Sequence, residues 1–215
     1  PKKKFKIQNP KIITKTSKAK IAKSKSPRLF AKIIIVNRAP FNKIELDFNE
    51  NEITDFIELT KDLPLVIRFI EFMPFEGNEW KTEKLVPLAS ILQNVAEHFG
   101  GDKIERIQDK PNDTSKNYRI KGFEGSFSVI STVTNPFCDS CNRIRLTANG
   151  TIKNCLFSED EVNILEVFRK NEPIMPVVKI ALENKHLMRG GMDTLEEFSD
   201  PKKNQANRSM ILIGG

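Results

Sequence analysis

The stretch LVIRFIEFM at residues 65–73 decides the fold class. Its apolar residues follow one another almost without alternation, which is typical of a parallel strand covered on both faces. Upstream, the β-branched run KIIIV at residues 32–36 predicts a second strand. Between these two runs, Ile53, Phe56 and Ile57 share one face of a helix. Strand, helix and strand over about 40 residues make a βαβ unit, so the sequence predicts an α/β fold.

Two charged residues, Arg68 and Glu71, interrupt the central strand. They are either a structural pair or side chains near the C-terminal end of a barrel strand, where active-site residues gather. Downstream, the apolar spacing of residues 87–99 predicts a helix. Short strands and turns follow it, with a further helix at residues 159–170 and a last strand in the terminal SMILIGG.

The net charge of +7 is distributed unevenly along the 215 residues. Residues 1–44 contain 14 of the 35 Lys and Arg residues and no Asp or Glu, so the other 171 residues hold 21 basic and 28 acidic side chains. An acidic body argues against general nucleic-acid binding. Residues 1–30 are rich in Lys, Ser and Thr without periodicity, and we expect a disordered basic lead there. No apolar run approaches the ~18 residues of a transmembrane helix.

The three cysteines lie within 18 residues, in the pattern Cys138-x2-Cys141-x13-Cys155. Three cysteines are too few for a disulfide framework, whereas the C-x2-C spacing lets two thiolates converge on one metal centre. The Asn149-Gly150 pair predicts a two-residue type I′ hairpin, which would bring Cys155 back opposite Ile144.

The residues alone leave three interpretations of this cysteine group open. One is an iron–sulfur cluster held by three cysteines, with one iron open to substrate. The second is a structural zinc ion that takes the distant His186 as its fourth ligand. The third is three free thiols. Arg143 and Arg145 follow at i, i+2 on a predicted strand, so they project from one face and could bind phosphate oxygens.

Three segments carry a family resemblance: RFIEFMPFEGNEW (68–80), TNPFCDSCNRIRLTANGTIKNCLF (134–157) and the terminal SMILIGG. They resemble the GTP 3′,8-cyclase family, the radical S-adenosylmethionine enzymes of molybdenum cofactor biosynthesis. The similarity extends over about residues 45–215. It implies the C-terminal part of an incomplete (βα)6 TIM-type barrel followed by an α+β iron–sulfur cluster domain. Residues 31–85 would hold the last barrel elements and residues 86–215 the domain that binds a 4Fe–4S cluster and GTP.

The resemblance also implies roles for individual residues. The ligands of the cluster, whose open iron would hold the guanine of GTP, would be Cys138, Cys141 and Cys155. The contacts with the GTP phosphates would be made by Arg143, Ile144 and Arg145. Met73 would lie at the S-adenosylmethionine site, and the catalytic Gly214 and Gly215 would reach into the active site. Lys32 is a candidate for the family's GTP-binding lysine.

The family is a group of lyases that convert GTP to (8S)-3′,8-cyclo-7,8-dihydroguanosine 5′-triphosphate. S-adenosylmethionine and a further 4Fe–4S cluster, bound by C-x3-C-x2-C, start that reaction, and this chain has no such motif. We therefore expect the C-terminal portion of an enzyme, inactive by itself. The alternative is a non-catalytic, metal-stabilised module whose basic arm binds nucleic acid or another anionic partner.

The resemblance further implies the partners and the compartment. GTP would be the substrate, the chain could form a homodimer, and cyclic pyranopterin monophosphate synthase would act downstream. We expect no nucleic-acid or membrane partner. A eukaryotic member would lie in the mitochondrial matrix and any other member in the cytoplasm.

Overall fold

The computed structural model describes residues 32–34, 50–75 and 80–200. The expected basic lead, the expected strand in SMILIGG and the two terminal glycines, Gly214 and Gly215, lie outside these ranges. Within them, none of the helices is both long enough and apolar enough to cross a membrane.

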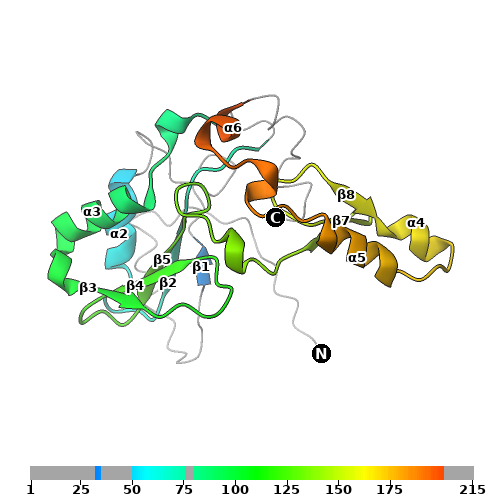
Figure 1. The fold of residues 1–215 in the computed structure, drawn as a ribbon. Coiled ribbons are helices and arrows are strands. Elements are labelled where there is room, and N and C mark those ends of the chain that lie inside the picture. Colours follow the sequence, from blue (N-terminus) through cyan, green and yellow to red (C-terminus); the bar gives the residue numbers. More distant parts are fainter. Residues whose placement is uncertain (1–31, 35–49, 76–79, 201–215) are drawn as a thin grey trace, which may run out of the picture.

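A five-stranded sheet forms the larger half of the described chain (Figure 1). Its strand order is β1-β2-β5-β4-β3. The pairs β1–β2 and β2–β5 are parallel, whereas the pairs β5–β4 and β4–β3 are antiparallel. The bounds of these strands are β1 Lys32–Ile34, β2 Val66–Ile70, β3 Ile104–Ile107, β4 Lys116–Ile120 and β5 Ser126–Ile130. The predicted mixed α/β character is confirmed. The sheet includes strands from both sides of the domain division expected at residues 85 and 86, and that division itself stays a prediction.

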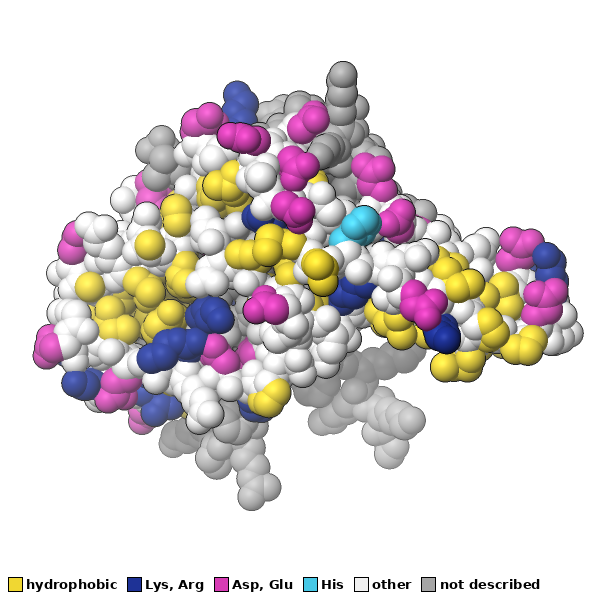
Figure 2. All heavy atoms as spheres, viewed as in Figure 1, with side chains coloured by type: hydrophobic (Ala, Val, Ile, Leu, Met, Phe, Trp, Pro, Cys, Tyr) yellow, Lys and Arg dark blue, Asp and Glu magenta, His cyan; other side chains and the backbone are white. Residues whose placement is uncertain are grey.

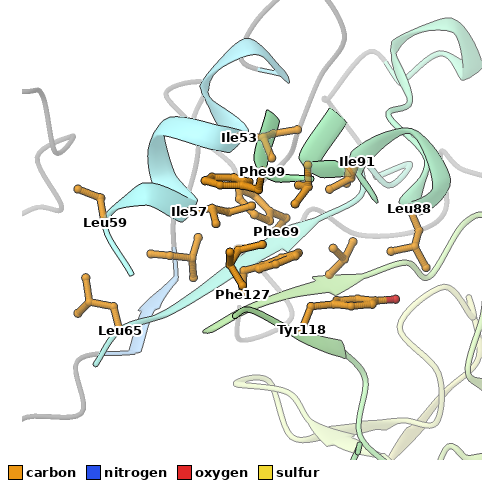
Figure 3. Packing of buried hydrophobic residues seen from close by; sticks show 14 of the residues in the cluster. Ile53, Ile57, Leu59, Leu65, Phe69, Leu88, Ile91, Phe99, Tyr118 and Phe127 are labelled. Carbon is orange, nitrogen blue, oxygen red and sulfur yellow. The ribbon is translucent and has the colours of Figure 1, made fainter. Parts of the chain in front are cut away.

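The helices α2 (Ile53–Glu58) and α3 (Leu88–Phe99) pack on this sheet, and their apolar faces build its core (Figures 1 and 3). Both helices were predicted. In β2 burial alternates, with Ile67 and Phe69 buried and the intervening residues half-buried, so the strand is shorter and less evenly covered than its composition indicates. Fifteen buried residues form the sheet core: Ile53, Ile57, Leu59, Leu65, Ile67, Phe69, Val86, Leu88, Ile91, Val95, Phe99, Tyr118, Ile120, Phe127 and Val129.

The helix predicted at residues 159–170 begins later than expected. Residues Glu161–Asn163 form strand β8 instead, and the helix α4 spans Ile164–Arg169. The Asn163 side chain accepts a hydrogen bond of 3.0 Å from the Glu166 backbone N–H, and this N-cap fixes the helix start. Phe168, on this helix, is 66% exposed.

Residues 145–183 form an arm that projects from the sheet (Figure 1). It contains the antiparallel sheet β6-β7-β8 and the helices α4 and α5, where β6 is Arg145–Leu146, β7 is Thr151–Lys153 and α5 is Met175–Glu183. Figure 2 shows apolar side chains gathered on its surface. The large apolar side chains of the arm that are exposed are Leu146, Phe168, Ile174, Met175, Ile180 and Leu182.

A second apolar cluster is separate from the sheet core. Its buried members are Phe75, Leu85, Val133, Phe157, Met192 and Phe198, the last from the helix α6 (Leu195–Ser199). Thr194 and Glu197 form a capping box at the start of α6. Single 3-10 turns connect the larger elements at Glu50–Glu52, Thr82–Lys84, Gly101–Lys103, Cys138–Ser140 and Arg189–Gly191.

Candidate functional site

The site begins at the C-terminal end of β2, where Glu71 is fully buried. Its carboxylate accepts hydrogen bonds from the backbone N–H groups of Leu88 at 3.1 Å and of Val133 and Thr134 at 3.0 Å, and from the Thr134 hydroxyl. Burial raises the pKa of Glu71, while these hydrogen bonds act against that rise. Glu71 therefore joins the sheet, the start of α3 and the loop that leads into the cysteines.

That loop carries Cys138 and Cys141, joined by a tight turn in which the Cys141 N–H donates to the Cys138 carbonyl at 3.0 Å. Cys155, which follows β7, reaches the same place, and all three are half-buried free thiols. Burial is the main cause that raises the pKa of Cys138, and the charges of Cys155 and Cys141 add to it. Cys141 and Cys155 thus lie near enough to Cys138 to act on its thiol electrostatically.

The hairpin that returns Cys155 differs from the predicted type I′ turn. Arg145 pairs with Lys153 and Leu146 with Ile152, which leaves three residues, 148–150, in the loop. Gly150 has a φ of +80°, but Asn149 does not have the positive φ that a type I′ turn requires. The predicted pairing of Cys155 with Ile144 is therefore wrong by one residue.

This shift of one residue decides which face of the strand Cys155 occupies, because side chains alternate along a strand. Continued beyond the paired residues Arg145 and Lys153, the observed register puts Cys155 opposite Arg143 and not opposite Ile144. The predicted register would have placed its thiol with the exposed Ile144, which is 42% exposed. The observed turn thus brings the third thiol to the arginines.

Arg143 and Arg145 share one face, as predicted. Both are half-buried together with Cys141, whereas the residues between them are exposed. Burial is the main cause that lowers the pKa of Arg145, and the neighbouring Arg143 also lowers it, while the thiols of Cys155 and Cys141 act in the opposite direction. The side chain of Ile144 points to the other face.

Arg143 is held by the loop between β3 and β4. Its Nη2 donates to the backbone carbonyl of Asn112, which has a φ of +60°, and its guanidinium lies 5.4 Å from the centre of the Phe137 ring. Its Nη1 is buried and has no hydrogen-bond partner within the described ranges. A buried guanidinium donor without an acceptor suits an anionic ligand.

Lys185, which sequence reasoning missed, closes the site from the segment after α5. Its Nζ donates to the carbonyls of Cys141 at 3.0 Å and Arg143 at 2.9 Å, and lies 3.5 Å from the Cys141 Sγ. Burial alone would raise the pKa of Cys141, but the Arg143 N–H and the Lys185 charge lower it overall. No motif or periodicity connects Lys185 with a cysteine 44 residues away, so the sequence held no signal for it.

A further donor comes from Arg189, whose backbone N–H lies 3.4 Å from the Cys138 Sγ. Hydrogen bonds to sulfur are a usual means by which a protein supports cluster ligands. In the described part of the chain, no three His, Cys, Asp or Glu side chains converge as a single metal ion requires. His186, the expected fourth zinc ligand, lies 3.1 Å from Asp160 instead, which gives the zinc interpretation no support.

The thiols nevertheless suit a cluster, in which each ligand binds a different iron and the ligands need not meet at one point. Their chemistry, their half-burial and the N–H donors directed at two of the sulfurs fit such a group. Met73, the expected S-adenosylmethionine residue, packs against the second apolar cluster, as does Cys155. Met73 and Cys155 therefore share one packing unit.

The relatives found by comparison with known proteins agree with one another. The family described as Molybdenum Cofactor Synthesis C matches residues 65–188. A mitochondrial GTP 3′,8-cyclase of Arabidopsis thaliana is 42% identical over 170 residues, 78% of this chain and 41% of the relative. A GTP 3′,8-cyclase of Listeria welshimeri is 45% identical over 64% of this chain and 41% of its own length. Molybdenum cofactor biosynthesis protein 1 of Mus musculus is 36% identical over 77% of this chain and 25% of its own length. The chain thus spans between 25% and 41% of these three relatives.

Proposed function

Since this chain belongs to the Molybdenum Cofactor Synthesis C family, we propose that it provides the part of a GTP 3′,8-cyclase that binds a 4Fe–4S cluster and GTP. The observation that carries the proposal is that three half-buried free thiols lie in one neighbourhood with two half-buried arginines. Thiolates are the ligands of iron–sulfur clusters, and guanidinium groups are suited to phosphate oxygens. A role in molybdenum cofactor biosynthesis is supported by the names of the relatives.

In this proposal Cys138, Cys141 and Cys155 hold the cluster. When bound, a cluster with three protein ligands supplies an iron with an open position for a substrate atom. The protein's own contribution is to orient the thiolates: the Arg189 N–H at 3.4 Å supports Cys138, and the Lys185 ammonium at 3.5 Å supports Cys141.

Arg143 and Arg145 would bind the triphosphate beside the cysteines. The buried Nη1 of Arg143 supplies a donor that a phosphate oxygen would satisfy. Arg145 is near both Cys141 and Cys155, so its guanidinium would lie between cluster and triphosphate. Because the side chain of Ile144 points away from this face, its contact with GTP would come from the backbone.

The complete reaction would need more than this sequence contains. All three cysteines are used at the site described, so the cysteines for a second, radical-generating cluster must lie outside the 215 residues. Within the chain, Met73 would contact S-adenosylmethionine, while Gly214 and Gly215 would reach the substrate. The product would be the 3′,8-cyclised nucleotide, passed to cyclic pyranopterin monophosphate synthase. If the chain is eukaryotic, its location would be mitochondrial, like that named for the Arabidopsis relative.

Anaerobic reconstitution with iron and sulfide tests the cluster assignment. We expect about four irons and four sulfides per chain, and we expect Cys155→Ser to lose most of both. One zinc ion without sulfide in the wild-type chain, or a full iron complement in Cys155→Ser, would contradict the assignment.

Binding of GTP tests the arginines independently. Arg145→Ala should weaken GTP binding by about 1–3 kcal/mol, because a hydrogen bond between two charged groups is lost. Arg119→Ala, at an exposed position on β4, is the matched control and should leave the affinity unchanged. Equal affinities of the two variants would remove Arg145 from the GTP site.

A further inference from the structure

The segment 185–192, KHLMRGGM, follows α5 and lies against the cysteine segment at two points. At one point the Lys185 ammonium bonds the carbonyls of Cys141 and Arg143. At the other the Arg189 N–H faces the Cys138 sulfur. Each end of the C-x2-C turn therefore has one donor from the same segment.

The Arg189 end of this segment is fixed in place. Arg189 is buried, its Nη1 donates to the Val133 carbonyl at 3.1 Å, and its guanidinium lies 5.0 Å from the centre of the Phe198 ring. The next residue, Gly190, leaves no room for a side chain, since a Cβ there would lie 2.5 Å from the Ser158 backbone nitrogen. A segment held in this way can serve as a rigid support for Lys185.

Lys185 directs the N–H donors of its ammonium group at one short segment of the chain. Within the described ranges, its hydrogen-bond acceptors belong to residues 141–143, and none of the ion pairs there includes Lys185. The nearest acidic residue in sequence, Glu183, pairs with Lys179 at 3.6 Å. Lys185 is half-buried, and its ammonium lies 3.5 Å from the Cys141 sulfur, where a positive charge can balance a negative one.

We propose that Lys185 is a positioning residue that fixes Cys141 and Arg143 relative to each other and balances the negative charge of the thiolate-bound cluster. One ammonium joins the carbonyls of residues i and i+2, so it holds the cluster ligand and the phosphate-binding arginine on the same face. This inference rests on the proposed function, and it adds to it a coupling between the two halves of the site.

The test compares Lys185→Met with Lys185→Arg and with Lys179→Met. Methionine removes the charge and the donors at similar length, arginine retains both, and Lys179→Met removes a charge from an exposed position on α5, the helix that precedes Lys185. In the protein without cluster, amide hydrogen exchange of residues 138–146 should accelerate about tenfold in Lys185→Met only, as expected for one lost hydrogen-bond group.

In the reconstituted protein, Lys185→Met should weaken GTP binding about tenfold and shift the cluster midpoint potential to more negative values, because a nearby positive charge favours the reduced form. Lys185→Arg should restore both properties. A merely structural lysine would alter exchange but leave the potential unchanged, which would overturn the charge-balancing role.

The outcomes separate the two hypotheses. If the wild-type chain assembles no iron and binds no GTP, the proposed function fails, and hydrogen exchange still decides whether Lys185 holds residues 141–143. If the wild-type chain binds both but Lys185→Met behaves like Lys179→Met, the proposed function stands and the positioning role of Lys185 is wrong.

Discussion

The sheet and the arm of this protein differ in how completely they bury their apolar side chains. The five-stranded sheet encloses a core of fifteen buried apolar residues, whereas the arm at residues 145–183 leaves six large apolar side chains exposed. In the arm, polar contacts carry much of the local order, among them the Asn163 cap and the Thr151 hydroxyl bond to Glu161 at 2.6 Å. Apolar burial therefore stabilises the sheet more than the arm, in which hydrogen bonds make a larger relative contribution. The cysteines lie at the junction of the two regions.

Removing one aromatic ring from each region tests this difference most directly. Phe127 is fully buried on β5 and stacks on Tyr118 with the ring centres 5.4 Å apart, whereas Phe168 on α4 is 66% exposed. Phe127→Ala should lower the free energy of unfolding by about 3–5 kcal/mol. Phe168→Ala should change it by less than about 0.5 kcal/mol. Chemical denaturation measures both, and similar losses would contradict the contrast between the regions.

Glu71 offers a test of the junction itself. Glu71→Gln keeps the shape but turns an amide NH2 toward backbone donors, so we expect a loss of about 1–3 kcal/mol in the free energy of unfolding. Burial raises the pKa of Glu71, so its contribution is largest below the usual pKa of a glutamate and declines as the pH rises through the raised value. The deficit of the variant should therefore shrink over that range.

Denaturation of Glu71→Gln as a function of pH provides the measurement. Glu105→Gln, on the exposed side of β3, is the control and should follow the wild type at every pH. A deficit that grows with rising pH would show that the sign assigned to Glu71 is wrong.

A smaller effect on the free energy of unfolding is expected at Asp109, which lies in the loop that also presents the Asn112 carbonyl to Arg143. The Arg106 guanidinium bonds Asp109 and, with Asn117, lowers its pKa to about 2. A lowered pKa contributes stability above the unfolded-state value near 3.8, and this contribution is lost as the pH falls toward 2. Asp109→Asn should cost about 1 kcal/mol at neutral pH and little at pH 2.

The pH dependence of unfolding for Asp109→Asn and for the exposed control Asp62→Asn decides this prediction. A deficit of Asp109→Asn that is equal at pH 7 and pH 2 would mean that the ion pair contributes nothing. Such a result would also leave the loop near Arg143 without its electrostatic support.

Elements with a strong local pattern could be predicted from the sequence. The apolar spacing of α3 and the apolar content of β2 indicated a helix and a strand where the structure has them. The helix α5 was missed because Pro176 and two valines give its first turn no helical signal, although proline is well accommodated at the start of a helix.

For the candidate site, the sequence suggested which residues act together but not their geometry. Spacing alone grouped the three cysteines and put the two arginines on one face. The position of Cys155 depended on whether the turn holds two or three residues, and the Asn-Gly pair is compatible with both. Lys185 and Glu71 join segments that are 42 to 63 residues away in sequence, so only the tertiary fold could reveal their contacts.

The pairing of β2 with β5 has a consequence for the order in which the chain folds. Ile67 is aligned with Phe127, across a long excursion of the chain, whereas β3, β4 and β5 are consecutive antiparallel neighbours. Short loops close at a lower entropic cost than long ones, and parallel pairing across a long separation is slow. We therefore expect the β3-β4-β5 meander to form first and the docking of β2 to limit the folding rate. The cysteine segment follows β5 in the sequence. It would therefore stay partly assembled until β2 docks and Glu71 reaches its place.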